Sequence, residues 1–454
     1  MIRELRVKNF KSWEDTGQLR LAPLTVFFGT NSSGKTSILQ LLLLLKQTIE
    51  STDRKLVLRT GDDISIVDLG KYSDLIYCHN VNLKLDISLS WELQEILKIK
   101  DPEKKVENLF EVTNLTFQVD IEGETGIPTV RKFTYSFDGN TFGMDNQGAT
   151  GKKSRYKLIS KPYQAKRKQA GRAWLLPSPT KFYGFPDEVK TYYQNVGFLS
   201  DFVLELEGLF SRRMAYIGPL RDYPKRIYTW AGEEPPDVGR KGELTVAAIL
   251  AAGHRGKYIS PGYHKKKRTL EERIAYWLKE MGIIDSFLVE QIATGRKEYE
   301  VKIRKTKSGP DVLITDVGFG LSQVLPVLVL PYYVKKGSTL LLEQPELHLH
   351  PSAQSWLADA FIDVVNNLNV QLIVESHSEH FLRRLQLRIA EEKISVDKTA
   401  LYFCKMQNSS SITEKLDVDL YGDIKNWPPD FFGDEMGELT AKTVAAMERQ
   451  AKGN

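Results

Sequence analysis

Residues 29–36, GTNSSGKT, match the pattern G-x-x-x-x-G-K-[ST] at every fixed position. In this pattern, backbone N–H groups surround the β-phosphate of a nucleotide, the lysine contacts the β and γ oxygens, and the last hydroxyl binds Mg²⁺. The apolar stretch LTVFF precedes the loop, and an apolar-striped segment follows it from Lys35 to about Glu50. A strand, a phosphate-binding loop and a helix are therefore expected in this order. We expect ATP to contact Asn31, Ser32, Ser33, Gly34, Lys35, Thr36 and Ser37.

The segment EQPELHLHP, residues 343–351, follows the apolar run STLLL, which is typical of the end of a buried strand. A P-loop ATPase needs a second acid for Mg²⁺ on a neighbouring strand. Glu343 supplies this acid, so we expect Thr36 and Glu343 to bind the metal together. The two motifs lie far apart in the sequence, which implies that an insertion splits one nucleotide-binding domain.

The same segment supports a second interpretation, a zinc site. Glu346, His348 and His350 alternate and would share one face of an extended chain, while His377 and His380 lie in another segment. Zinc is commonly bound by such side chains. This alternative predicts a metal-dependent hydrolase with stoichiometric zinc, but it does not explain the P-loop.

The elements that must hold these residues follow a regular order. Residues 1–80 and 311–398 alternate between strand and helix patterns, which is typical of a largely parallel sheet. Residues 81–310 contain alternating segments such as RKFTYSFDGN, which are typical of antiparallel strands. We predict an α/β fold: a P-loop nucleotide-binding head with a mixed sheet. Its N-terminal part (1–80) and C-terminal part (311–398) are separated by an α+β insertion (81–310) and followed by a C-terminal extension (399–454).

Composition excludes several classes of protein. The 454 residues, 41% of them hydrophobic, are sufficient for two or three folded domains. No apolar run approaches the roughly 18 residues of a membrane helix, and the first residues lack the apolar core of a signal peptide. We therefore expect a cytoplasmic protein without a membrane partner. Cys78 and Cys404 lie far apart, which excludes a disulfide scaffold and a cysteine-rich zinc module.

Four segments resemble ABC-type ATPases of the SMC, RecF and OLD group. In order, they are IRELRVKNFKSWED, similar to the N-terminal strand and turn of that group; GTNSSGKTS, its Walker A motif; DVGFGLSQVLPVL, its signature segment; and LLLEQPELHLHP with LIVESHSEHFLRR, its Walker B, D-loop and switch histidine. In particular, the chain resembles stand-alone bacterial ATPases of the OLD-like class, which are known as AAA-type predicted ATPases. Relatives of these act in anti-phage systems such as Septu and PARIS.

The resemblance implies a composite site. Gly318, Gly320 and Ser322 would face the γ-phosphate bound by another subunit, at the N-terminus of a helix that starts near Leu321. Glycines permit close backbone approach, and a helix N-terminus favours an anionic phosphate. The signature segment therefore implies a homo-oligomer, at least a head-to-head dimer with ATP between the subunits.

Other residues also receive roles from the resemblance. His377 matches the switch histidine and would contact the γ-phosphate or the attacking water, and His350 falls at the D-loop position, where it would meet the other subunit. Lys11 and Ser12 lie where the group sometimes contacts nucleotide. The segment IVDLGKYSDLIY, where a glutamine loop should fall, contains no glutamine. Arg221 and Arg226 could serve nucleotide, a partner or internal ion pairs.

In the resembled group, the residue after the Walker B acid is usually a glutamate that polarises the attacking water. Here it is Gln344, which cannot accept a proton, and general-base assistance is typically worth about 10² to 10⁴ in rate. Glutamine can still orient water, so we expect slow hydrolysis. Because Pro345 favours an extended Gln344, Glu346 is expected on the same side as the missing carboxylate. The predicted catalytic residues are Glu343, Gln344, Glu346 and His377.

Two basic segments are consistent with nucleic-acid binding. Residues 152–172 contain nine Lys or Arg and no acid, with Tyr156, Tyr163 and Trp174 within or beside them, and residues 264–268, HKKKR, form a second cluster. Basic side chains could bind DNA or RNA phosphates, and the aromatic rings could stack on bases. Solvated loops explain the same composition equally well. Residues 417–438, with seven Asp or Glu and one Lys, suit a basic partner or a solvated surface equally well.

We therefore expect an ATPase that dimerises around ATP and regulates a partner effector, such as a nuclease or toxin, in bacterial anti-phage defence. A RecF-like DNA-binding ATPase of repair or recombination is the alternative, and it predicts that DNA stimulates ATP turnover. The chain lacks the strand-bound Glu and Asp-x-Asp arrangement of the Toprim domain that OLD nucleases carry. We do not expect it to cleave nucleic acid alone.

Overall fold

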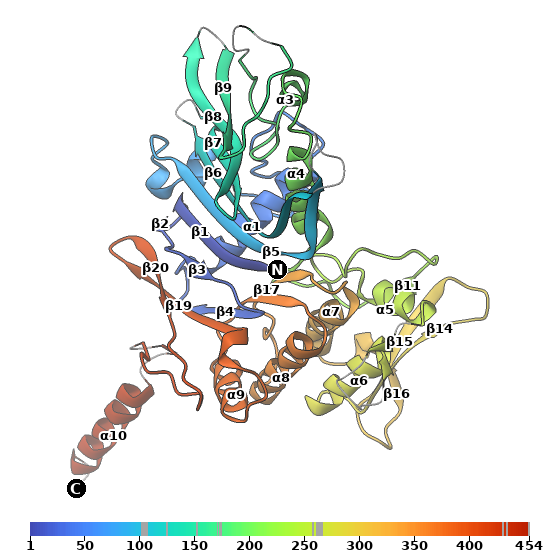
Figure 1. Cartoon of the computed structure of the whole chain (residues 1–454). Coiled ribbons are helices and arrows are strands. Elements are labelled where there is room, and N and C mark those ends of the chain that lie inside the picture. Colours follow the sequence, from blue (N-terminus) through green and yellow to red (C-terminus); the bar gives the residue numbers. More distant parts are fainter. Residues whose placement is uncertain are drawn as a thin grey trace.

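Figure 1 shows the computed structural model of the chain. The structure describes residues 1–100, 108–123, 126–150, 153–169, 171, 175–256, 258–259, 267–428, 431–432 and 435–452. The described part therefore excludes Trp174, residues 152, 170 and 172 of the first predicted basic segment, and residues 264–266 of the second.

A six-stranded sheet holds the P-loop. Its order is β10-β17-β18-β4-β19-β20, and all neighbours are parallel except the β19–β20 hairpin. β17 and β18 are buried along their whole length, as expected for strands covered on both faces. The mixed α/β fold class is confirmed. The strands are β4 (Leu24–Gly29), β10 (Met214–Ile217), β17 (Thr339–Glu343), β18 (Gln371–Glu375), β19 (Thr399–Gln407) and β20 (Ser410–Lys415).

Alternation of side chains along these strands divides the apolar core in two. Phe27 and Leu341 pack in one cluster with the P-loop helix α1 (Lys35–Glu50). Phe28 and Leu342 pack in the other. That second cluster contains residues of α7 (Phe319–Tyr333), α8 (Pro351–Asn367) and α9 (Glu379–Ala390). Helices on both faces therefore fix the edge of the sheet at which the strands end.

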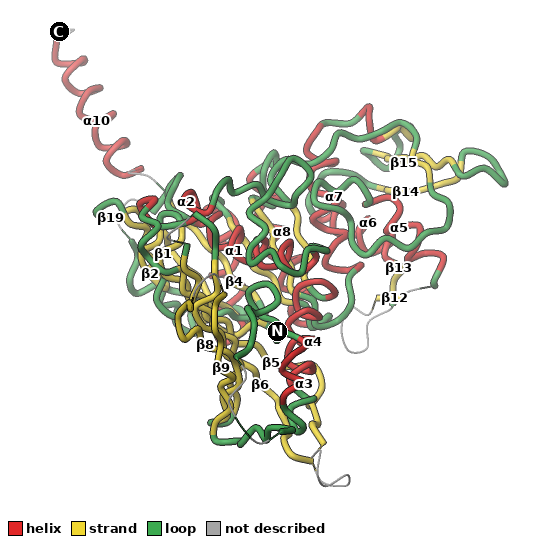
Figure 2. Tube along the Cα trace, turned by 90° about the horizontal axis from the view of Figure 1, so that it is seen from above, coloured by secondary structure: helices red, strands yellow, loops and turns green. Residues whose placement is uncertain are grey.

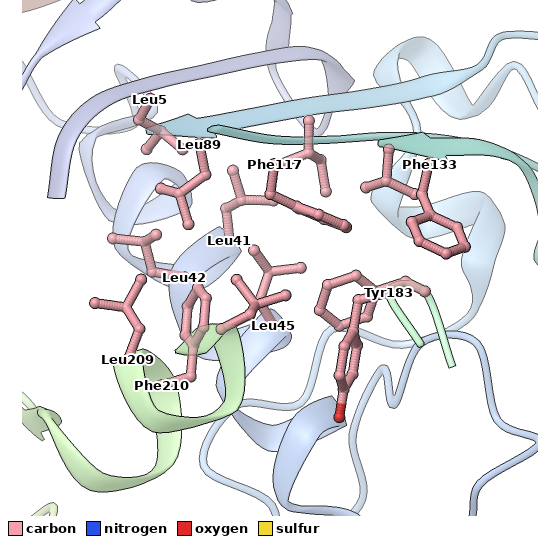
Figure 3. Close-up of a cluster of buried hydrophobic side chains, with 14 of the residues drawn as sticks. Leu5, Leu41, Leu42, Leu45, Leu89, Phe117, Phe133, Tyr183, Leu209 and Phe210 are labelled. Carbon is pink, nitrogen blue, oxygen red and sulfur yellow. The ribbon is translucent and has the colours of Figure 1, made fainter. Parts of the chain in front are cut away.

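A second, antiparallel sheet covers α1 from the other side. Its order is β2-β1-β5-β6-β7-β8-β9, with β3 beside β1. Leu41, Leu42 and Leu45 of α1 lie between Leu89 and Phe117 of this sheet and the segment that carries Leu209 and Phe210 (Figure 3). The strands are β1 (Ile2–Phe10), β2 (Trp13–Asp15), β3 (Leu19–Arg20), β5 (Leu85–Lys100), β6 (Asn108–Glu122), β7 (Thr129–Phe137), β8 (Asn140–Thr150) and β9 (Lys153–Lys161).

β1 lies in the predicted N-terminal ATPase part, yet it pairs with β5 of the predicted insertion from Ile2 to Lys8. The antiparallel strands of residues 81–161 thus extend a sheet that the N-terminal strand begins. The division into residues 1–80, 81–310, 311–398 and 399–454 stays a prediction.

A smaller α+β part lies beyond α7, away from β8 and β9 (Figure 2). It contains the sheet β11-β15-β14 with β16 beside β15, and the two-stranded β12–β13. Its elements are β11 (Tyr228–Thr229), α5 (Thr245–His254), β12 (Tyr258–Ile259), β13 (Arg268–Thr269), α6 (Leu270–Glu280), β14 (Ser286–Gln291), β15 (Glu298–Arg304) and β16 (Asp311–Leu313).

The last helix, α10 (Glu435–Lys452), extends away from the rest of the chain in both views (Figures 1 and 2). Within the described residues, no helix combines the length and apolarity needed to span a membrane. The remaining short helices are α2 (Tyr72–Leu75), η1 (Tyr77–His79), α3 (Asp187–Tyr192), α4 (Leu199–Glu207), η2 (Gly208–Arg212), η3 (Ile314–Asp316) and η4 (Val396–Lys398).

Candidate nucleotide-binding site

The P-loop has the predicted strand, loop and helix around it. β4 ends at Gly29 and α1 begins at Lys35, with Gly34 at φ 87° as the residue before the helix. Asn31 and Ser32 are exposed at the loop tip, Ser33 is buried, and Thr36 and Ser37 are half-buried in the first turn. The N-terminus of α1 thus opens into the loop, which is the geometry that binds phosphate.

The Lys35 side chain lies across the P-loop. Its Nζ donates to the Gly29 carbonyl at 3.1 Å and to the Thr30 carbonyl at 2.7 Å. Burial lowers the pKa of Lys35, and the nearby charge of Glu375 opposes that shift. These bonds hold the ammonium at the loop, where phosphate oxygens can replace the carbonyls as acceptors.

Two elements outside the motif pack on the P-loop. The Trp13 indole N–H, from the start of β2, donates to the Gly34 carbonyl at 3.1 Å. Ser411 of β20 bonds to Ser12 at 2.7 Å between the hydroxyls. A Cβ at position 34 would lie 2.5 Å from Ser411 Oγ and 2.8 Å from Trp13 Nε1, so only glycine fits there.

Lys11 and Ser12 were predicted near the nucleotide. Ser12 lies against the P-loop, whereas the Lys11 ammonium donates to Gln40 Oε1 of α1 at 2.6 Å. Trp13 and Ser411 were missed. No local motif marks them, because a β-hairpin nearly 400 residues away in sequence brings Ser411 to the loop.

Two acids end neighbouring strands beside the P-loop. Glu343 of β17 and Glu375 of β18 are paired in register, and Glu375 is also paired with Phe27 of β4. The Thr36 hydroxyl donates to Glu375 Oε1 at 2.9 Å. The sequence predicted Thr36 and Glu343 as the metal pair, and Glu375 was missed. Its signal was available, because LIVE ends on an acid as TLLLE does.

Burial dominates the electrostatics of this pair. It raises the pKa of Glu343 to about 7, and the charge of Glu375 adds to the shift, while a hydrogen bond with the Tyr216 hydroxyl opposes it. Burial also raises the pKa of Glu375, against the bond from Thr36 and the charge of Lys35. Two buried carboxylates at one sheet edge favour a bound cation, because each alone is costly to ionise.

The chain turns sharply after Glu343. Gln344 has φ 42°, the Leu347 N–H donates to the Gln344 carbonyl at 3.1 Å, and the Leu349 N–H donates to the Glu346 carbonyl at 3.1 Å. The predicted extended Gln344 was wrong. The Gln344 N–H donates to the Glu375 carbonyl at 2.9 Å, and this bond with the following turn overrides the preference that Pro345 imposes.

Arg221 clamps the start of this turn. Its Nη2 donates to the Glu343 carbonyl at 3.0 Å and to the Gln344 carbonyl at 3.1 Å. The side chain is buried, and burial lowers its pKa to about 10, against the charge of Glu346. Arg226 instead forms an exposed ion pair with Asp316 at 3.0 Å. Arg221 therefore bonds within the turn, whereas Arg226 forms a surface ion pair. The sequence did not indicate this difference.

Glu346 connects the turn to the predicted switch histidine. Its Oε1 accepts the His377 backbone N–H at 2.7 Å, and burial raises its pKa. Burial lowers the pKa of His377, and the charge of Lys35 adds to the shift. His377 therefore stays neutral at pH 7 and can offer one N–H and one lone pair.

The predicted signature segment forms the start of α7. Gly318 precedes the helix, which begins at Phe319, two residues before the expected start. A Cβ on Gly318 would meet no atom within 4 Å, whereas a Cβ on Gly320 would lie 2.9 Å from the His348 carbonyl. The Ser322 hydroxyl donates to the Phe319 carbonyl at 2.8 Å. Gly320 therefore lies against the turn after Glu343, whereas Gly318 is exposed.

The predicted zinc ligands do not form a site. His348 and His350 are exposed, and His350 accepts the Ser352 N–H as the cap of α8. Within the described part of the chain, no group of three His, Cys, Asp or Glu residues has an arrangement that could hold a metal ion. The turn breaks the alternation on which the zinc interpretation depended.

The aromatic residues of the first basic segment point inward. Tyr156 of β9 is buried and its hydroxyl donates to the Val130 carbonyl at 2.6 Å. The Tyr163 hydroxyl donates to the Asn195 carbonyl at 3.0 Å. In the second segment, Arg268 lies over the Tyr276 ring, 4.6 Å from its centroid. The predicted stacking of bases on Tyr156 is therefore wrong, because this side chain belongs to the core.

Two parts of the chain match models of known protein families. Residues 1–172 and 257–382, more than half of the chain, match a family model described as an AAA ATPase domain. Residues 394–441 match a model described as a protein of unknown function, DUF3696. The search of curated proteins found no match.

Solved SMC head domains are also similar to the chain. The head from Thermotoga maritima is 11% identical over 92% of this chain and 99% of that chain, with a TM-score of 0.41. A head bound to the C-winged helix domain of ScpA is 10% identical over 91% and 98%, with a TM-score of 0.45. A Pyrococcus furiosus head bound to the C-terminal domain of ScpA is 9% identical over 91% and 96%, with a TM-score of 0.41.

Proposed function

Because this chain is an ATPase that belongs to the AAA ATPase domain family, we propose that it binds ATP with Mg²⁺ at the P-loop, dimerises around the nucleotide and hydrolyses it slowly. The observation that carries the proposal is the convergence of Lys35, Thr36, Glu343 and His377 at one edge of the parallel sheet. Each of these groups can contact one part of a nucleoside triphosphate with its metal ion.

The residues present fit a hard cation. The Thr36 hydroxyl and the Glu343 carboxylate offer oxygen ligands, and Glu375 Oε2 is buried without a hydrogen-bond partner among the described residues. Thr36 and Glu343 would hold Mg²⁺. Bound Mg²⁺ would neutralise charge on the phosphate oxygens.

Gln344 and Glu346 would each help to position the attacking water. Gln344 cannot accept a proton, but its amide can hydrogen-bond a water molecule. Glu346 is buried, and its Oε2 has no hydrogen-bond partner among the described residues, so it is the carboxylate on this turn with a free oxygen. We assign Glu346 the role of assisting the attacking water, next to His377.

The exposed N-terminus of α7 supports the dimer. Gly318 has open space around it, and the 15-residue helix behind it favours an anion at this end. In the dimer, this end of one subunit would meet the γ-phosphate on the P-loop of the other. ATP would then act as a switch that joins two chains, and slow hydrolysis would set how long they stay joined.

We further propose that the dimer regulates an effector, such as a nuclease or toxin, in anti-phage defence. α10 extends from the body and offers a segment by which a partner could be contacted (Figure 1). Reading the neighbouring genes and co-purifying their products with the chain tests this role. Stimulation of ATP turnover by DNA, without an associated protein, would favour the RecF-like alternative.

Turnover tests the enzymatic part of the proposal. We expect slow, Mg²⁺-dependent release of phosphate by the purified chain, abolished by Glu343→Gln. A variant with Glu414→Gln, which removes a surface charge paired with Lys405, serves as the matched control. Equal turnover by the wild type and Glu343→Gln would refute the site.

A further inference from the structure

Glu375 occupies the middle of the proposed metal site. It ends β18, the strand between β17, which ends at Glu343, and β4, which leads into the P-loop. The Thr36 hydroxyl donates to Glu375 Oε1 at 2.9 Å. The Thr36 hydroxyl, which is expected to bind Mg²⁺, is therefore hydrogen-bonded to Glu375.

One oxygen of Glu375 is free to bind a ligand. The residue is 3% exposed, and its Oε2 has no hydrogen-bond partner among the described residues. The Lys35 ammonium, whose charge acts on Glu375, donates hydrogen bonds to the Gly29 and Thr30 carbonyls. A buried carboxylate oxygen without a donor is costly unless a cation binds it.

The geometry of the strands gives Glu375 a neighbour of the same kind. Register pairs it with Glu343 on the adjacent strand, and paired residues on parallel strands project to the same face. Two carboxylates and one hydroxyl form a set of oxygen ligands only. Such a set suits Mg²⁺ and Mn²⁺ better than it suits zinc.

We propose that Glu375 is a second carboxylate that holds the divalent cation of bound ATP, together with Thr36 and Glu343, directly or through one water. This proposal rests on the proposed function, because it adds a residue to the same site. Two negative charges beside the phosphates repel ATP when the cation is missing and hold it when the cation is present. Nucleotide binding should therefore depend steeply on the metal.

Equilibrium binding in the presence and absence of metal tests the proposal. Binding of ATPγS is measured over a range of Mg²⁺ concentrations and in EDTA, and bound Mn²⁺ is followed by electron paramagnetic resonance. In Glu375→Gln the side-chain oxygen still accepts from Thr36, but the charge is lost. We expect the Mg²⁺ concentration for half-maximal ATPγS binding to rise at least about tenfold. Affinity in EDTA should be unchanged or higher, and the Mn²⁺ signal should broaden or weaken.

Two further variants keep the result interpretable. Glu375→Asp keeps the charge with a shorter side chain, so its Mg²⁺ requirement should lie between those of the wild type and Glu375→Gln. The control Glu414→Gln should bind metal as the wild type does. Thermal unfolding of each variant shows that it is folded before binding is compared.

The outcomes separate this inference from the proposed function. A wild type that binds no ATPγS would refute the proposed function. If the wild type binds it but Glu375→Gln has the same Mg²⁺ dependence, Glu375 is not a metal-holding residue. Equal loss of binding by Glu375→Gln in Mg²⁺ and in EDTA would also overturn the inference, because the role would then be structural.

Discussion

The P-loop and the turn after Glu343 meet at one sheet edge, but they are stabilised in different ways. In the P-loop, the polar groups that would contact phosphate already bond to the protein: Lys35 to loop carbonyls and Thr36 to Glu375. Around the turn, buried polar atoms of Arg221 and Glu346 have no hydrogen-bond partner among the described residues. The P-loop groups can exchange hydrogen bonds within the protein for hydrogen bonds to a ligand. The buried polar atoms of the turn, in contrast, can form hydrogen bonds that the described residues do not supply. We infer that the P-loop provides affinity and that the turn responds to what is bound.

The largest effect is expected at the P-loop. Lys35→Met removes the only cation that the motif contributes, and charge-assisted hydrogen bonds are worth about 1.5 to 3 kcal/mol each. We expect ATP affinity, measured with a fluorescent analogue, to fall at least about tenfold and turnover to become undetectable. Lys415→Met, at an exposed lysine of β20, should change neither. Normal ATP affinity in Lys35→Met would contradict the assignment of the loop.

The clamp on the turn gives the next effect. Arg221→Leu leaves the Glu343 and Gln344 carbonyls without their donor and Glu346 without a nearby cation. We expect the free energy of unfolding in urea to fall by about 3 to 5 kcal/mol. Arg226→Leu, which breaks only an exposed pair with Asp316, should be neutral. Equal effects of the two variants would mean that the turn does not depend on Arg221.

Substitutions at Gln344 and Glu346, the two residues of the turn that we propose to position water, should change turnover in opposite directions. Gln344→Glu introduces a carboxylate that can accept a proton, so phosphate release should rise by about tenfold or more. Glu346→Gln should lower phosphate release by a similar factor, with ATP affinity unchanged. If Glu346→Gln leaves turnover untouched, its assigned role is wrong, and Gln344 with His377 must position the water without it.

A smaller effect is expected where the first β-hairpin supports the P-loop. Trp13→Phe removes the N–H that bonds the Gly34 carbonyl and keeps the aromatic ring in the core. A hydrogen bond of this kind contributes about 0.5 to 1.5 kcal/mol, so ATP affinity should fall by about two- to twelvefold. Trp277→Phe removes a comparable bond to Tyr332 in another region and should lower stability but not ATP affinity.

The same contrast explains what the sequence could predict. The P-loop, its strand and its helix follow from one contiguous motif whose hydrogen bonds are local, and α1 has the bounds that the apolar stripe indicated. The TLLLE and LIVE strands also follow, because buried parallel strands are uninterrupted apolar runs.

The turn was not predictable in the same way. The conformation of Gln344 depends on its bond to the Glu375 carbonyl and on Arg221, which lies more than 120 residues earlier. Glu375 itself required the strand order, since only the position of β18 between β17 and β4 brings it to Thr36. Tyr156 was misassigned because a basic segment can contain a strand whose aromatic side chain faces the core.

The proposed switch depends on whether ATP joins two chains. The mass of the wild-type chain in solution is measured without nucleotide, with ATP and EDTA, and with ATP and Mg²⁺, alongside Lys35→Met as the variant that should not respond. We predict a species of twice the mass of one chain only for the wild type with ATP and Mg²⁺. A wild-type chain that binds ATP and Mg²⁺ but keeps the mass of a single chain would contradict the composite site.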